Sequence, residues 1–283
     1  MSAIVGAADA PVTKLPLWQT IRLAYAAYLR HFGDGMRIAA LWLPPVAILA
    51  AIGGFVQAVL LAEMTQGARP QIGAFQPIHL LMLGYALNFL LTAAAISSAV
   101  AWHRMLLVKE QPTASSGRNI GTRFFWRYVG AGLVIGLIAA IPLAVVLVAM
   151  ALLDLLPAAG SAPPAEIAVI TLADIAGIVL MLRFSPLLPA RAAGNLSLSL
   201  KGAWQSTRGN LWRLFLGIAA CALPPFLLVK IIFIALTIVP MGSGLYLLQW
   251  AAASAIALCC WLTLWPIWIV FLSHAYRQLV PAA

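Results

Sequence analysis

Charged residues are scarce in this sequence. Only 8% of its 283 residues are Asp, Glu, Lys or Arg, whereas 64% are hydrophobic. A water-soluble domain of this length needs a much larger polar surface. The composition therefore excludes a soluble globular protein and indicates that lipid surrounds most of the chain.

Residues that commonly perform chemistry are scarce too. No two of the seven acidic residues are close in the sequence, so no carboxylate pair suited to acid–base catalysis can be identified. The chain contains no phosphate-binding Gly-rich loop ending in Lys-Ser or Lys-Thr, no His-Glu-x-x-His pair and no nucleophile elbow. The three cysteines lie in apolar runs without metal-ligand spacing. We therefore expect no enzymatic activity, no cofactor and no metal site.

Long apolar runs take up most of the chain. A helix needs roughly 20 mainly apolar residues to cross about 30 Å of hydrocarbon. Six such runs predict an all-α, polytopic membrane bundle of three helical hairpins, and we expect 1–283 to form a single integral membrane domain with a flexible N-terminus over 1–14. The approximate bounds of the spans are 37–62, 78–102, 128–153, 167–188, 211–239 and 244–272.

Positive charge separates the three hairpins. Of the 17 Lys and Arg residues, only Arg69 lies at a predicted hairpin tip and only Lys230 lies deep inside a predicted span, away from its cytoplasmic end. Because positive loops are retained in the cytoplasm, both termini are expected on the cytoplasmic side of a bacterial inner membrane. The net charge of +10 then sets the orientation and contacts anionic lipid headgroups, rather than nucleic acid.

Two basic, aromatic segments predict amphipathic helices on the cytoplasmic side. Over 15–33, aromatic and aliphatic side chains recur at spacings of three and four, and basic side chains occupy another face. The segment 198–208 repeats this pattern. Such a helix lies in the headgroup plane, where it either contacts a cytoplasmic partner or sets the tilt of the next span. The expected interfacial contacts are Trp18, Arg22, Arg30, Trp204 and Arg208.

The hairpins also resemble copies of one unit. Trp18–Arg22 is similar to Trp204–Arg208, and Leu43–Pro45 is similar to Leu223–Pro225. Chance similarity is common between Leu- and Ala-rich spans, so an internal repeat and coincidence both stay open. Prolines inside a span remove a backbone hydrogen bond, and the resulting kinks either line a cavity or serve packing alone.

Two charges lie deep inside predicted spans. Asp174 is about eight residues, and Lys230 about nine, from the outer ends of the fourth and fifth spans, roughly 12–14 Å deep at about 1.5 Å per residue. A bare charge at that depth costs at least about 2.5–3.5 kcal/mol. We therefore expect an ion pair inside the bundle, with Asn88 and Gln57 completing a polar cluster. Polar packing, outward extension of Lys230 and a substrate or proton site all stay open.

The most specific motif lies between the second and third hairpins. Arg183–Ala190, then Leu198–Trp204 and Thr207–Asn210, resemble a group of bacterial six-span inner-membrane proteins. That group includes the YciC-like proteins and the membrane domain of some glycerophosphodiester phosphodiesterases. The resemblance covers nearly the whole chain and is closest over 183–213. It implies a fold and a location, because in the phosphodiesterases a separate soluble domain performs the catalysis.

Two functions are compatible with these features. The first is a non-enzymatic scaffold, assembly or envelope-maintenance factor, whose basic rim contacts membrane lipids and a membrane protein partner or a second copy of the chain. The alternative is a transporter or permease-like protein for a small solute or lipid, with a site near Asp174 and Lys230. A filled interior favours the first, and an open cavity that reaches these charges favours the second.

Overall fold

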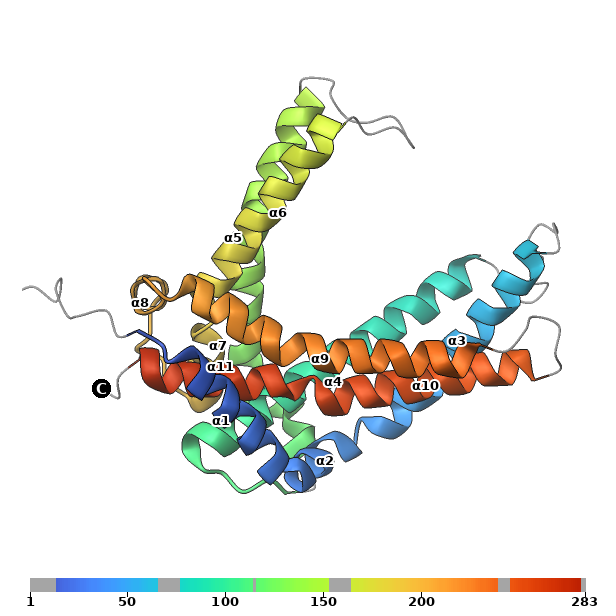
Figure 1. Ribbon diagram of the computed structural model, residues 1–283, viewed down its shortest axis with the longest axis horizontal. Helices are drawn as coiled ribbons and strands as arrows, with labels where there is room; N and C mark the ends of the chain where they lie inside the picture. Colours follow the sequence, from blue (N-terminus) through green and yellow to red (C-terminus); the bar gives the residue numbers. More distant parts are fainter. Residues whose placement is uncertain (1–13, 66–76, 114–115, 153–163, 239–244, 281–283) are drawn as a thin grey trace, which may run out of the picture.

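The computed structural model describes residues 14–65, 77–113, 116–152, 164–238 and 245–280 (Figure 1). All regular elements among these residues are helices, and six helical segments are long and apolar enough to cross a membrane. The predicted all-α polytopic fold is therefore confirmed. Of the terminus predicted as flexible, only Lys14 is among the described residues. The helices are α1 (Leu17–Arg30), α2 (Phe32–Ala40), α3 (Leu43–Thr65), α4 (Pro77–Val108), η1 (Ser116–Gly121), α5 (Arg123–Leu152), α6 (Pro164–Phe184), α7 (Leu187–Ala193), α8 (Leu200–Ser206), α9 (Leu211–Thr237), α10 (Tyr246–Leu264) and α11 (Pro266–Leu279).

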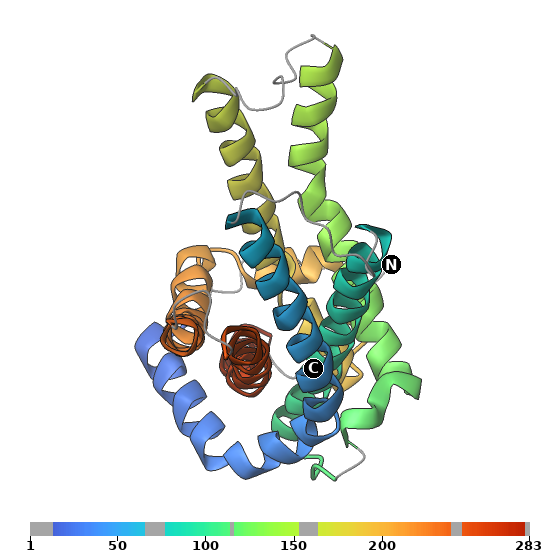
Figure 2. The same cartoon turned by 90° about the vertical axis from the view of Figure 1, so that its right-hand side faces the viewer.

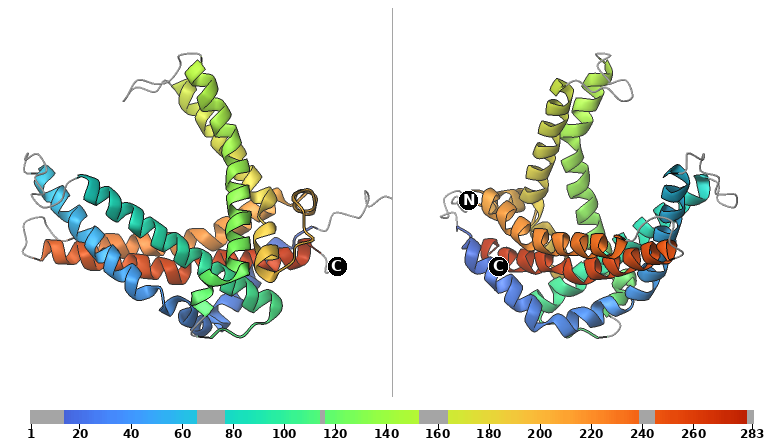
Figure 3. Two further views of the ribbon diagram at one scale, coloured as in Figure 1. Left: turned by 180° about the vertical axis from the view of Figure 1, so that it is seen from behind. Right: turned by 45° about the vertical axis from the view of Figure 1, so that its right-hand side comes forward.

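The long helices form three hairpin arms that extend from one common end of the molecule (Figures 1 and 3). We call this end the base; it contains α1, α2, η1, α7, α8 and the C-terminal end of α11. The α5–α6 arm points away from the other two arms, whereas α10 packs along both α3 and α9. The six spans are thus splayed rather than gathered into one closed bundle.

The core of the molecule lies at the base, around α11. Ile269, Val270 and Phe271 are fully buried, and α11 contacts α1, α4, α7 and α9. Figure 2 shows α10 and α11 nearly end-on, with α9 and the first three helices around them. Gly217 of α9 allows this approach, because a Cβ atom there would collide with the Phe271 ring.

The α5–α6 arm is apolar over most of its surface. Leu137, Val145 and Leu172 are 61–70% exposed, and a helix that is apolar on all sides is typical of a membrane span. The two helices cross closely, since a Cβ atom at Gly177 would lie 2.6 Å from the carbonyl oxygen of Ala139. The arm therefore packs on itself and presents its remaining faces to lipid.

Prolines interrupt the helix at two places where the sequence predicts a continuous span. Pro44 and Pro45 have no N–H group to donate to the preceding turn, so the predicted span 37–62 consists of the end of α2, a two-residue turn and α3. Pro266 similarly separates α10 from α11, which divides the predicted span 244–272. Pro142 and the pair Pro224–Pro225 lie inside α5 and α9. The two proline pairs therefore occupy different places in their helices, and the internal repeat stays a prediction.

The first amphipathic helix is buried more deeply than an interfacial helix would be. Thr20, Ile21, Ala24 and Tyr28 of α1 are buried, and α1 packs on α11 and α9. Part of the predicted aromatic stripe is therefore turned into the protein instead of toward headgroups. Of the expected interfacial contacts on this helix, Trp18 is 74% exposed, and Arg22 and Arg30 are also exposed.

The second amphipathic helix, α8, is a single short element. The Ser199 hydroxyl accepts a hydrogen bond from the Gly202 N–H over 3.1 Å and caps it. Trp204 is 42% exposed and rests on the end of α6, where its ring lies 5.7 Å from the Phe184 ring and 4.9 Å from the Arg183 guanidinium. Arg208, just after the helix, is exposed.

Candidate functional site

The predicted ion pair inside the spans does not form. Asp174 and Lys230 are both exposed, and the ion pairs among the described residues join His31 to Asp34, Arg37 to Asp34 and Arg104 to Glu110. The physical reason is the divergence of the arms: α6 packs mainly on α5, and α9 packs mainly on α10 (Figure 1). Two spans that are consecutive in sequence thus contribute to different arms.

The other two members of the predicted cluster are also separated from each other. The Asn88 side-chain amide donates to the Gly84 carbonyl of its own helix over 3.0 Å. Gln57 of α3 instead faces a pocket that Lys230 also lines. The structure therefore brings together one predicted pair, Gln57 and Lys230, and leaves Asp174 and Asn88 elsewhere.

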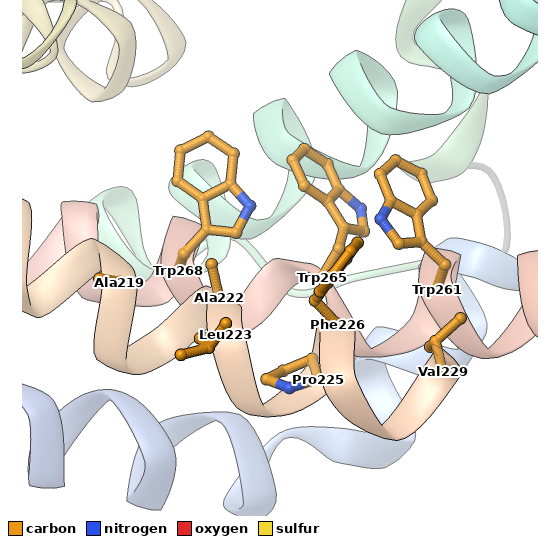
Figure 4. Close-up of a pocket in the computed structure, with 9 residues that line it drawn as sticks. All are labelled: Ala219, Ala222, Leu223, Pro225, Phe226, Val229, Trp261, Trp265 and Trp268. Atoms are coloured by element: carbon orange, nitrogen blue, oxygen red, sulfur yellow. The ribbon is translucent and has the colours of Figure 1, made fainter. Parts of the chain in front are cut away.

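The pocket shared by Gln57 and Lys230 continues along α9. It has a volume of about 470 Å³ and lies between α3, α9 and α10, with Leu87 of α4 at its edge. A second pocket of about 370 Å³ extends toward the base and shares Phe226, Val229 and Trp261 with the first. Figure 4 shows Trp261, Trp265 and Trp268 in a row above α9. We call the two connected pockets the α9 trough.

A larger cavity, with a volume of about 710 Å³, opens at the base. We call it the basal cleft, and it lies where α1, α2, α11 and the end of α4 meet. Four cationic side chains, two carboxylates and two histidines line it, so it is much more polar than the α9 trough. These residues are Arg30, Arg37, Lys109, Arg277, Asp34, Glu110, His31 and His274.

The carboxylates of the basal cleft already have partners. Asp34 accepts from Arg37 over 3.4 Å and lies 3.2 Å from the His31 imidazole. Glu110 pairs with Arg104, which lies outside the cleft lining. Arg30 and Lys109, in contrast, make no ion pair with any described residue. The cleft therefore retains unneutralised positive charge, which favours an anionic ligand.

Local backbone geometry holds the cleft open. Lys109 has a φ of 55° and ends α4 with a left-handed residue, which turns the chain across the base. The Arg277 guanidinium donates to the Leu106 carbonyl and so joins the ends of α11 and α4. The cationic side chains consequently belong to a braced junction of helices rather than to free loops.

His103, near the end of α4, is fully buried. Its Nδ1 lies 2.7 Å from the Ser273 hydroxyl oxygen of α11, and its ring lies 5.8 Å from the Tyr128 ring of α5. His103 thus joins α4, α5 and α11 just above the base. In the sequence, His103 is distinguished only as a polar side chain beside an apolar run. That pattern does not show which helices meet at this residue.

The motif over 183–213 has a structural explanation. Arg191 donates to the carbonyls of Asn195 and Leu198, and Gly194 ends α7 with a φ of 85°. The Asn210 side-chain oxygen accepts from the Leu15 N–H over 2.8 Å and so fixes the start of α1. These residues therefore shape the backbone at the base.

Within the described ranges, no three His, Cys, Asp or Glu side chains lie close enough to hold a metal ion. Comparison of the chain with protein families, with curated proteins and with solved structures finds no match in any of the three. The resemblance to YciC-like proteins and to the membrane domain of phosphodiesterases therefore stays a prediction. What the chain does must be inferred from the basal cleft and the α9 trough.

Proposed function

We propose that this multi-pass membrane protein is a non-enzymatic scaffold, assembly or envelope-maintenance factor of the bacterial inner membrane, which holds anionic lipid headgroups in its basal cleft. The observation that carries the proposal is the convergence of four cationic side chains from separate helices on one cavity at the base. Three of them, Arg30, Lys109 and Arg277, have no carboxylate partner among the described residues. A headgroup phosphate supplies the missing negative charge and several acceptor oxygens.

The position of the cleft supports a headgroup ligand. The helices α1 and α8 and the end of α11 carry Arg22, Arg30, Lys201 and Arg277, and these elements lie together at the base (Figure 1). If positive segments stay in the cytoplasm, the base lies at the inner leaflet, whose anionic lipids attract each nearby Lys or Arg by about 1 kcal/mol. The cleft would thus meet headgroups without leaving the membrane surface.

The transport alternative receives less support from this geometry. It requires Asp174 and Lys230 at one site, and the two side chains belong to arms that diverge. Lys230 lines a cavity, but Asp174 does not line the same one. We therefore favour a role in holding lipids and partners over a role in moving a polar solute.

The proposal is tested by measuring the lipids that the protein retains. Purified protein is exchanged into mixed micelles of phosphatidylglycerol and phosphatidylethanolamine, and the bound lipids are counted by native mass spectrometry. We expect wild type to prefer phosphatidylglycerol. The double substitution Arg30→Gln and Lys109→Gln should lower that preference by roughly 2 kcal/mol, a factor of about thirty.

The matched control removes the same charge elsewhere at the base. Arg22 and Arg208 are exposed and do not line the cleft, so the double substitution Arg22→Gln and Arg208→Gln should leave most of the preference intact. Equal losses in the two double variants would show that only overall rim charge matters, and the cleft would then not be a headgroup site.

A further inference from the structure

The α9 trough contains one cation that nothing in the described structure neutralises. The Lys230 ammonium lines the trough and forms no ion pair with a described residue; its recorded contact is the Phe226 ring, 5.6 Å away. Gln57 and Ser254 are the other polar side chains of this pocket. An apolar cavity with a single positive group at one end is complementary to a molecule with a single negative group and an apolar body.

The dimensions of the trough match such a molecule. Its lining on α9 extends from Phe233 to Ala219, and Lys230 lies eleven residues, roughly 16 Å of helix, from Ala219. The two pockets, of about 470 and 370 Å³, each fall within the range of about 300–1,000 Å³ that is usual for ligand sites. The trough is therefore long, narrow and large enough for an alkyl chain.

The far end of the trough is suited to hydrocarbon. Trp261 and Trp265 are stacked with ring centroids 5.4 Å apart, and Trp268 lies 5.2 Å from Trp265. Together with Leu223 and Phe226 they form an apolar surface beside Pro225 (Figure 4). No charged side chain lines this second pocket.

We propose that the α9 trough binds the anion of a long-chain fatty acid, with the carboxylate at Lys230 and the alkyl chain along Trp261, Trp265 and Trp268. The carboxylate accepts a charge-assisted hydrogen bond from the ammonium, and the Gln57 amide is the second polar group at that end. This site is separate from the basal cleft and does not depend on the headgroup proposal.

The depth of Lys230 favours a single-chain acid over a phospholipid. Lys230 lies seven residues before the end of α9 at Thr237, roughly 10 Å along the helix. A phospholipid would have to bring its phosphate and glycerol to that depth, where few polar groups could receive them. A fatty acid brings only a carboxylate, and the trough offers one ammonium for it.

The experiment uses the full-length protein in nonionic detergent and a dibrominated stearic acid, whose bromine atoms quench tryptophan fluorescence on contact. We expect saturable quenching in wild type. The affinity for the acid should fall at least about tenfold in Lys230→Met, since a charge-assisted hydrogen bond contributes that factor or more, and should be retained in Lys230→Arg. The methyl ester of the same acid should bind both of these variants and wild type alike.

A steric pair of variants tests the place of binding. A Cβ atom at Gly53 would meet only Leu87, 3.9 Å away, inside the trough, so Gly53→Leu should fill the cavity and weaken both the acid and the ester. Gly132 of α5 has no atom within 4 Å of an added Cβ, so Gly132→Leu should change neither. If Gly53→Leu does not fold, the affinities of Lys230→Met and Lys230→Arg for the acid still test the proposal.

A diazirine-bearing palmitate then locates the bound chain by mass spectrometry. Labelling of peptides that contain 219–229 or 261–268 supports the proposal. The proposal is wrong if wild type and Lys230→Met bind the acid equally, if labelling falls outside the trough, or if phosphatidylglycerol displaces the acid at equal concentration. Any of these results would leave the lipid preference of the basal cleft unaffected.

Discussion

Tyr25 and Tyr28 complete hydrogen bonding near two proline sites. Pro224 has no N–H group, so the Ala220 carbonyl four residues earlier lacks its helical partner, and the Tyr25 hydroxyl donates to it over 2.9 Å. The Tyr28 hydroxyl donates to the backbone carbonyl of Thr263, in the last turn of α10 before Pro266, over 2.7 Å. Two tyrosines of α1 thus supply hydrogen-bond donors to backbone carbonyls near the prolines of α9 and α11.

Removing either hydroxyl should destabilise the protein. A buried carbonyl left without a donor costs about 1–3 kcal/mol, so we expect Tyr25→Phe and Tyr28→Phe to lower the apparent melting temperature in detergent by several degrees. Tyr85 is 67% exposed, and Tyr85→Phe is the matched control. Equal melting temperatures for all three variants and wild type would show that the two hydrogen bonds do not stabilise the fold.

The Tyr28 hydroxyl also predicts a response to high pH. Burial raises its pKa to about 12, above the value of about 10 in an unfolded chain. The folded state therefore holds this proton more tightly, and the stabilisation is complete below about pH 10 and lost as the pH rises toward about 12. Melting temperature should consequently fall more steeply with pH in wild type than in Tyr28→Phe. Parallel curves would contradict the assignment.

At the residue scale, the sequence showed which side chains were unusual but not what they would contact. Lys230 was correctly singled out as a charge in an apolar span, yet its predicted partner Asp174 lies on another arm. Pairing was inferred from similar depth and adjacency in sequence. Depth restricts a side chain to a layer of the membrane, whereas contact also depends on which helices are neighbours.

At the scale of the helix, Gly54 decides how closely α3 approaches α10. A Cβ atom at Gly54 would lie 2.6 Å from the Trp250 carbonyl oxygen, whereas one at Gly53 would meet only Leu87. We expect Gly54→Ala to destabilise the protein by about 1–3 kcal/mol, the usual cost of overpacking, and Gly53→Ala to be tolerated. Thermal unfolding of the two variants in the same detergent makes the comparison, and equal stability would exclude a close crossing at Gly54.

The existence of the helices could be predicted, but their neighbours could not. Apolar runs of sufficient length define the spans, and the proline sites explain the breaks before α3 and before α11. The spans are apolar on all sides, so no polar face indicates which side of α3 packs on another helix. For this reason the packing of α3 along α10, and with it the α9 trough, was not visible in the sequence.

At the scale of the whole molecule, the distribution of positive charge along the sequence agrees with the arrangement of the three arms. The C-terminal ends of α3, α5 and α9 lie away from the base, at the far ends of the three arms (Figures 1 and 3). The sequence predicts the same division, because basic stretches alternate with hairpins. With an even number of crossings we expect both termini on one side, and because positive segments are retained in the cytoplasm, we propose that this side is the cytoplasm.

This orientation can be tested with single cysteines in a protein whose native cysteines are replaced by alanine. Trp18, Leu152 and Ile238 are 74–79% exposed. Trp18 belongs to α1 of the base, Leu152 ends α5, and Ile238 follows α9, so the last two belong to different arms. We expect a membrane-impermeant maleimide to label Leu152→Cys and Ile238→Cys in intact cells, and Trp18→Cys only after permeabilisation. Labelling of Trp18→Cys from outside would reverse the orientation, and it would move the basal cleft away from the inner-leaflet lipids that the proposed function requires. Opposite behaviour of Leu152→Cys and Ile238→Cys would instead contradict the three-hairpin topology, because both arms must end on the same side of the membrane.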